Sequence, residues 1–207
     1  MQKASAILAA TVTVLALGTG VWFAVGPGGG EGRFAACGTT SVAGGRALGG
    51  DFTLTAPDGS RLSRAEVIDR PSLVYFGYTF CPDVCPADAA RNAAAVSLLA
   101  ERGLDVHSVF VTIDPERDTP EQLGTFAEYF GVPMTALTGS AEELERMRRD
   151  YLVYAAKSGD DAEFYLMDHS TFTYLELPGE GVLDILRHEA SPEEVADKVA
   201  CYADAAG

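Results

Sequence analysis

The order of apolar runs and helix-start signals constrains the fold of this chain more than any other feature of its 207 residues. Apolar runs bounded by turn residues are typical of strands, and longer segments with a helical period are typical of helices. This pattern predicts strands near residues 51–55, 72–78, 106–113, 151–156, 171–177 and 182–187. It predicts helices near residues 86–102, 120–130, 141–150 and 192–202.

Two helix starts carry a complete local signal. Thr119 and Ser191 are each followed by a proline at the first helical position and by a glutamine or glutamate three residues on, which is a capping box. Strands alternate with helices up to a final strand pair and a last helix, so both faces of one sheet need to be covered. The order therefore predicts an α/β, thioredoxin-like fold with a mixed central sheet flanked by helices.

Two cysteines lie where the first central strand of this arrangement ends and a helix begins. The segment YFGYTFCPDVCPAD, residues 75–88, holds Cys81 and Cys85. Residues i and i+4 of a helical turn share a face, so both sulfurs can bind one ion, or close a disulfide after modest movement. Three intervening residues are one more than in the C-x-x-C of thioredoxin-type enzymes. A redox pair, a structural disulfide and two metal ligands all remain open.

Asp83 lies between the two cysteines. Its carboxylate is expected to disfavour a nearby thiolate, yet it is compatible with a bound cation. The alternative is that Asp83 only begins the helix. The neighbouring aromatic residues Tyr75, Phe76 and Tyr78 are interpreted as core and site-wall residues.

A third ligand has to come from elsewhere in the chain. Two thiolates alone can hold Cu(I), whereas Cu(II) also requires imidazole. Of the three histidines, His107 lies in a strand pattern, His188 in a polar loop, and His169 where a polar segment enters an apolar strand. Lone histidines are more often structural than ligands, so residue chemistry alone leaves His169 only a candidate.

The N-terminal segment predicts a membrane anchor. Residues 4–25 are uncharged and long enough to cross a bilayer, and a cleaved signal peptide is the alternative. We expect an anchor at residues 1–25, a glycine-rich tether at 26–36 and one domain at 37–207. Lys3 favours an inside N-terminus, which places the domain on the extracytoplasmic face of the cell membrane.

The charge of the domain argues against nucleic acid as a partner. The chain has 15 basic and 30 acidic residues. Lys3 is the one charged residue among the first thirty, so residues 31–207 hold 14 basic against 30 acidic groups, a net charge of -16. Cations or a partner with a basic surface suit this charge better.

Five segments between Gly49 and about Lys198 together resemble the Sco/SenC family of membrane-anchored copper chaperones. They are GGDFTLTAPDG, LVYFGYTFCPDVCP, FVTIDPERDTPE, LTGS and MDHS. The resemblance implies that Cys81, Cys85 and His169 bind one copper ion, as Cu(I) or Cu(II). It also implies delivery of copper to the dinuclear centre of cytochrome c oxidase subunit II, or reduction of the cysteines of that centre. Asp114 and Asp118 match the family pattern too, and structural roles are favoured for both.

Cys37 and Cys201 lie outside the matched segments. In an oxidising compartment a Cys37–Cys201 disulfide leaves Cys81 and Cys85 free for function. A Cys₄ zinc site lacks the second close cysteine pair that such sites have, and lipidation of Cys37 is disfavoured by Arg33 and the glycine-rich stretch before it.

Three functions follow from these residues. The first is a copper chaperone, whose other partners would be periplasmic copper carriers or thioredoxin-like reductases. The second is a thiol-disulfide oxidoreductase that cycles Cys81 and Cys85. A peroxidase ranks last, because no basic residue lies within the motif.

Overall fold

A computed structural model of the chain describes residues 32–38, 48–159, 161 and 164–207. Residues 37–207 form one compact unit. Among the described residues no helix is both long and apolar enough to span a membrane. The predicted anchor lies outside these residues, as does most of the predicted tether.

A five-stranded mixed sheet forms the centre of the unit. Its order is β5 (Met134–Leu137), β4 (His107–Thr112), β3 (Ser72–Gly77), β8 (Thr173–Leu177) and β9 (Gly181–Leu186). The pairs β3–β4 and β4–β5 are parallel, and β8 is antiparallel to both β3 and β9. Together with the helices around it, this sheet confirms the predicted thioredoxin-like α/β fold.

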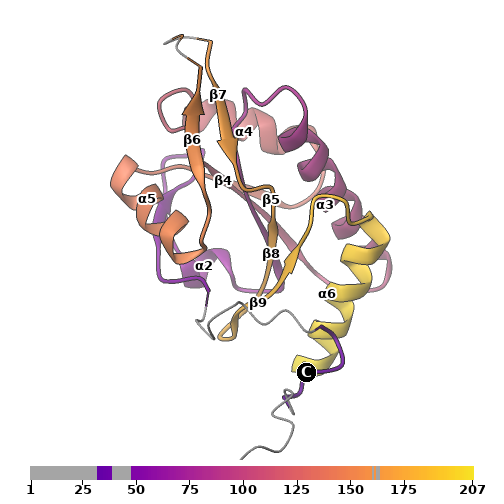
Figure 1. Cartoon of the computed structure of the whole chain (residues 1–207). Helices are drawn as coiled ribbons and strands as arrows, with labels where there is room; N and C mark the ends of the chain where they lie inside the picture. The colour runs from indigo at the N-terminus through magenta and orange to yellow at the C-terminus, as the bar shows by residue number, and fades with distance from the viewer. Residues whose placement is uncertain (1–31, 39–47, 160, 162–163) are drawn as a thin grey trace, which may run out of the picture. The chain divides into compact units, whose positions relative to one another are not determined.

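The helices lie on both sides of the sheet (Figure 1). The long helix α3 (Val84–Glu101) lies beside α6 (Pro192–Ala206), and α5 (Ala141–Asp150) lies on the opposite side of the sheet. The helix α4 (Pro120–Tyr129) packs against β5. A short helix α2 (Arg64–Val67) precedes β3.

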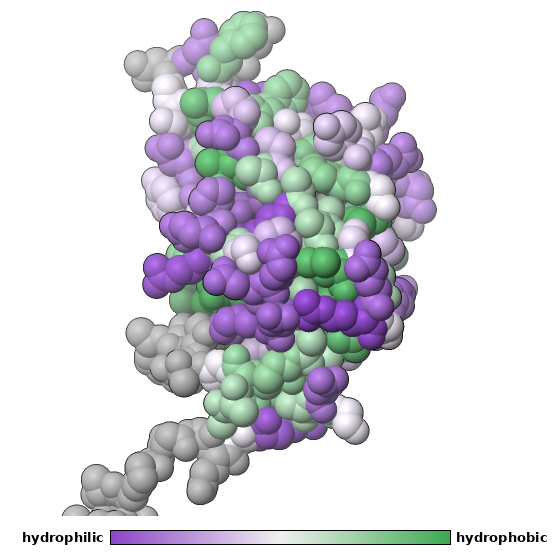
Figure 2. Space-filling view, turned by 90° about the vertical axis from the view of Figure 1, so that its right-hand side faces the viewer, coloured by the Kyte–Doolittle hydropathy of each residue, from purple (hydrophilic) through white to green (hydrophobic). Residues whose placement is uncertain are grey.

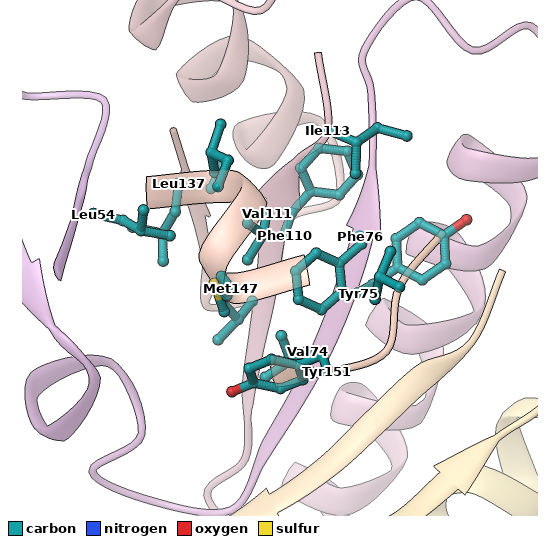
Figure 3. Close-up of a cluster of buried hydrophobic side chains, with 14 of the residues drawn as sticks. Leu54, Val74, Tyr75, Phe76, Phe110, Val111, Ile113, Leu137, Met147 and Tyr151 are labelled. Atoms are coloured by element: carbon teal, nitrogen blue, oxygen red, sulfur yellow. The ribbon is translucent and has the colours of Figure 1, made fainter. Parts of the chain in front are cut away.

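The alternation of side chains along β3 separates the core from the site face. All six residues of β3 are buried. Figure 3 shows Phe76 on the side of Met147 and Tyr151, with Tyr75 pointing the other way. The ring of Phe76 lies 5.2 Å from that of Tyr151 and 5.8 Å from that of Tyr174. The Tyr75 ring can therefore pack on the side of the sheet where the helix after β3 lies.

Two small antiparallel sheets flank the central one. One pairs β1 (Thr53–Thr55) with β2 (Arg61–Ser63), and the other pairs β6 (Ala155–Ser158) with β7 (Leu166–His169). The β6–β7 ribbon extends beyond the central sheet (Figure 1). On the face of the molecule shown in Figure 2, hydrophilic and hydrophobic residues are interspersed.

Most predicted elements are present, and one strand was placed wrongly. The capping boxes at Thr119 and Ser191 form, and α5 has the predicted bounds. The strand predicted at residues 151–156 begins only at Ala155, because Tyr151 caps α5 and Leu152 turns the chain with a φ of 55°. Pattern reading also missed four short elements, α2, β2, β5 and β7.

Candidate metal centre

Cys81 and Cys85 lie at the junction of β3 and α3, as predicted. The strand ends at Gly77, and α3 begins at Val84 with Asp83 as its N-cap residue. The Cys85 N–H donates to Cys81 Sγ at 3.3 Å, so the free amides of the first helical turn face that sulfur. Cys85 is fully buried, whereas Cys81 is half-buried. Only one of the two sulfurs is thus open to solvent.

Gly77 allows this close packing. A β-carbon at this position would lie 2.8 Å from Tyr75 Cε1, 3.0 Å from Phe110 Cε2 and 3.1 Å from Cys85 Sγ. These distances are shorter than ordinary van der Waals contacts. The missing side chain lets the end of β3 approach the thiol directly.

His169 reaches the cysteines from the last position of β7. Its Nε2 lies 3.3 Å from Cys85 Sγ, and its Nδ1 lies 2.8 Å from the carbonyl oxygen of Ser170. A carbonyl oxygen only accepts, so Nδ1 carries the proton and the lone pair of Nε2 faces the sulfurs. The rings of Tyr75 and Tyr78 meet the imidazole edge-on, at 6.4 and 6.0 Å between centroids.

The three side chains form one potential ligand set. One ligand atom from each of Cys81, Cys85 and His169 lies within 4.8 Å of the other two. No further histidine, cysteine, aspartate or glutamate joins this set in the described part of the chain. Two sulfurs and an imidazole nitrogen are a soft donor set that suits copper or zinc rather than magnesium or calcium.

The two thiols differ strongly in acidity. The pKa of Cys81 is lowered to about 3, first by the hydrogen bond from the Cys85 thiol and further by the N–H groups of Asp83 and Cys85. The contact with Cys81, followed by burial, raises the pKa of the Cys85 thiol. Cys81 is therefore the thiol that ionises more readily, and the proton of Cys85 has to leave before both sulfurs bind a metal.

Asp83 begins α3, which agrees with one of the two interpretations of this residue. Its side chain is exposed and makes no capping hydrogen bond, while its N–H donates to Cys81 and lowers the pKa of that thiol. The backbone of the residue therefore helps to stabilise the Cys81 thiolate.

The two aspartates of the DPERDTP segment have structural roles. Asp118 is buried and accepts hydrogen bonds from the N–H of Thr79 at 3.1 Å, from its hydroxyl at 2.6 Å, and from the Thr112 hydroxyl at 2.6 Å. Asp114 accepts from the Tyr165 hydroxyl at 2.7 Å. Both carboxylates fix loops beside the centre, which agrees with the structural roles favoured for them.

Asp168 and the two other histidines lie outside the ligand set. Asp168 is exposed, and strand alternation points it away from the face of His169. His107 contacts the Val67 carbonyl at 3.1 Å and the Thr135 hydroxyl at 2.9 Å, and burial lowers its pKa. His188 contacts Asp88 at 2.9 Å. Neither of these two histidines joins the ligand set.

Cys37 and Cys201 are joined by a disulfide. The S–S distance is 1.98 Å, and the Cα atoms are 5.5 Å apart. The bond ties the start of the compact unit to α6 and leaves Cys81 and Cys85 as free thiols.

Sequence reasoning missed three contributors to the centre. Gly77 gives room to Cys85, the Ser170 carbonyl sets the tautomer of His169, and Arg117 contacts both sides of the site, as described below. A glycine inside an otherwise continuous strand was an available signal for the first. The Ser170 carbonyl acts on its chain neighbour through a side-chain conformation that the pattern does not encode, and Arg117 depends on contacts between distant segments.

Comparison with known proteins gives a consistent result. The chain matches the SCO1/SenC family over residues 40–204. Protein SenC of Rhodobacter capsulatus is 47% identical over 175 residues, which are 84% of this chain and 78% of the relative. Copper-bound ScoI of Arabidopsis thaliana is similar at a TM-score of 0.72 and 34% identity, covering 76% of this chain and 99% of that one.

A second solved structure agrees with the first. Copper-bound ScoI of Bradyrhizobium japonicum has a TM-score of 0.69 and 31% identity, covering 75% of this chain and 99% of that one. Fold, motif spacing and sequence identity all lead to the same assignment, and the chain belongs to the SCO1/SenC family.

Proposed function

We propose that this protein is a copper chaperone that binds one copper ion through Cys81, Cys85 and His169. The observation that carries the proposal is the meeting of these three ligand atoms within 4.8 Å, from two segments 84 residues apart. Thiolates suit Cu(I), and the added imidazole makes the site suitable for Cu(II). Similarity to two proteins solved with copper bound supports copper over zinc.

The partial exposure of the centre suits a metal ion that is transferred to another protein. Cys81 is half-buried at the surface, while Cys85 is fully buried behind it. An incoming thiol can reach the metal from the Cys81 side without unfolding the domain. Such an exchange replaces one ligand at a time, so the ion need not be released into solvent.

We propose the dinuclear copper centre of cytochrome c oxidase subunit II as the destination, an assignment that rests on the family resemblance. The test mixes copper-loaded protein with the metal-free copper domain of subunit II and follows the absorption of the dinuclear centre. The proposal predicts transfer from the wild type and little transfer from His169→Ala. Equal transfer from both, or from free copper at the same rate, would contradict it.

We further propose that residues 4–25 anchor the chain in the cell membrane, with the domain on the extracytoplasmic face. The Cys37–Cys201 disulfide supports this location, because structural disulfides persist in oxidising compartments. External protease added to spheroplasts should degrade the domain. Full protection there, with degradation only after lysis, would place the domain inside.

A second candidate function is thiol-disulfide exchange, which the half-exposed Cys81 and the low pKa of its thiol favour. The Cys81 thiolate would attack a target disulfide and release one target thiolate. Cys85, after losing its proton, would then attack Cys81 Sγ, so that a Cys81–Cys85 disulfide forms and the target is left reduced. A thioredoxin-like reductase would restore the dithiol. Retention of this exchange in His169→Ala would separate it from copper binding.

A further inference from the structure

The third ligand of the proposed centre lies on an element that the central sheet does not hold. Within the described residues β7 pairs with β6 alone, and the five-stranded sheet resumes only at Thr173. The two cysteines lie on the β3–α3 junction of that sheet. Side chains, rather than a backbone ladder, therefore have to fix the distance from His169 to the sulfurs.

Arg117 contacts both parts of the site. Its Nη1 donates to the Tyr165 carbonyl at 2.9 Å, just before β7, and its guanidinium lies 3.6 Å from the centroid of the Tyr165 ring. On the other side the same guanidinium lies 4.9 Å from the ring of Phe80, the residue before Cys81. It also lies 5.8 Å from the ring of Tyr78.

The guanidinium is itself held in place. Its Nε donates to Asp114 at 2.6 Å, and the Tyr165 hydroxyl donates to the other oxygen of the same carboxylate at 2.7 Å. Asp114 is buried, and the Arg117 side chain is 15% exposed. Arginine, aspartate and tyrosine thus form a closed arrangement beside the ribbon.

One polar atom of this arrangement has no hydrogen-bond partner. Arg117 Nη2 is buried and has no hydrogen-bond partner among the residues that the structure describes, and the guanidinium lies over the rings of Tyr165 and Phe80. A delocalised planar cation can lie over ring faces in this way, whereas a lysine ammonium is a compact, strongly hydrated charge. The site therefore requires the shape of arginine and not only its charge.

Resting on the proposed copper site, we propose that Arg117 is a positioning residue that holds the His169 ribbon against the cysteine loop. It links Tyr165, four residues before His169, to Phe80, directly before Cys81. Removing it leaves the two sulfurs in place on the β3–α3 junction and loosens the ribbon, which keeps the hydrogen bond from the Met167 N–H to the Tyr78 hydroxyl at 3.2 Å. Two thiolates still suffice for Cu(I), whereas Cu(II) loses its nitrogen ligand.

The test compares Arg117→Met and Arg117→Lys with wild type by two readouts. Without metal, amide hydrogen exchange of residues 164–170 should rise at least tenfold in Arg117→Met, and Arg117→Lys should not restore protection. With metal, both variants should retain one Cu(I) per chain, while the sulfur-to-Cu(II) charge-transfer band should change as it does in His169→Ala.

Two further variants provide the controls. Lys157→Met removes a cation 4.5 Å from the same Tyr165 ring, but Lys157 is exposed and pairs with Glu116, so wild-type exchange and spectra are expected. Phe80→Ala removes the ring that Arg117 contacts beside Cys81, from a residue that is 48% exposed, so folding should be retained. The rise in exchange over residues 164–170 should be smaller in Phe80→Ala than in Arg117→Met. If Arg117→Met does not fold, the rise in Phe80→Ala still tests the proposal.

The two proposals fail in different ways. Wild-type exchange over residues 164–170 in both Arg117→Met and Phe80→Ala would overturn the positioning role, whatever the protein binds. Wild-type protein that binds no copper would contradict the proposed function, while the exchange measurement would still decide the role of Arg117.

Discussion

Gly77 is the residue at which the strand and the metal centre constrain each other most directly. It ends β3 with its backbone against Cys85 Sγ, where a β-carbon would lie 3.1 Å from the sulfur. Both the thiol and the Tyr75 ring beside it are buried, so neither can move aside freely. The glycine is required for close approach and not for a turn.

Gly77→Ala should therefore damage both stability and the site. We expect the free energy of unfolding in urea to fall by about 1–3 kcal/mol, as for an overpacked core, with an altered Cu(II) absorption band. Gly124→Ala is the matched control, because its β-carbon would meet only Pro57, at 3.2 Å. Unchanged unfolding and an unchanged spectrum in Gly77→Ala would contradict the packing argument.

The ligand residues differ in how far the sequence alone could identify them. Cys81 and Cys85 are one helical turn apart, so local geometry predicts that they act together. His169 is 84 residues from Cys85, and residue chemistry left it a candidate until the family resemblance was considered. Arg117 was not identified, because its role depends on two ring contacts that no periodic pattern encodes.

Among the secondary-structure elements, the end of α5 shows why one strand was predicted too early. The N–H of Val153 donates to the Arg148 carbonyl at 2.7 Å, and that of Leu152 donates to Arg149 at 3.3 Å. This is a Schellman ending, with Leu152 where glycine is usual. An apolar residue in the left-handed position resembles the start of a strand in a pattern that considers polarity alone.

The short elements were missed for a related reason. β5 has four residues directly after Pro133, and β7 has four residues that include Asp168 and His169. Such segments are too short for a period to be recognised, and their pairing with β4 and β6 is decided by tertiary contacts.

One buried carboxylate connects three elements and gives a sharp stability prediction. Glu176 of β8 is fully buried, accepts from Arg64 of α2 at 2.5 Å, and accepts from the Tyr151 hydroxyl after α5. Arg64→Met leaves that charge without its cation. We expect chemical denaturation to show a loss of about 3 kcal/mol, the lower end for a broken buried pair, because Arg64 is partly exposed.

The matched control is Arg61→Met. Arg61 pairs with Glu143 at the surface, where both partners are solvated, so its removal should change the unfolding midpoint far less. Equal effects of Arg64→Met and Arg61→Met would show that the buried pair stabilises the fold no more than the surface pair does.

For the protein as a unit, the order of strands and helices predicted the mixed sheet, and the cysteine inventory predicted the Cys37–Cys201 disulfide, which the structure confirms. The Cys37–Cys201 disulfide spans 164 residues of sequence, almost the entire compact unit. A cross-link of that span restricts the unfolded chain strongly. It leaves Cys81 and Cys85 as free thiols.

The double variant Cys37→Ser/Cys201→Ser should separate stability from metal binding. We expect the free energy of unfolding to fall by roughly 2–5 kcal/mol, measured by thermal and urea unfolding. The Cu(II) spectrum of the folded variant should match that of wild type. A changed spectrum at full folding would show that the disulfide shapes the site.

Copper loading of the reduced full-length protein, beside His169→Ala, decides whether Cys81, Cys85 and His169 form one metal centre. We expect one Cu(I) and, separately, one Cu(II) per wild-type chain, with a sulfur-to-Cu(II) absorption that His169→Ala removes or shifts strongly. The variant should keep Cu(I), because both thiolates remain. Wild-type protein that retains no copper, or binds Cu(II) with a spectrum indifferent to His169, would contradict the three-ligand centre.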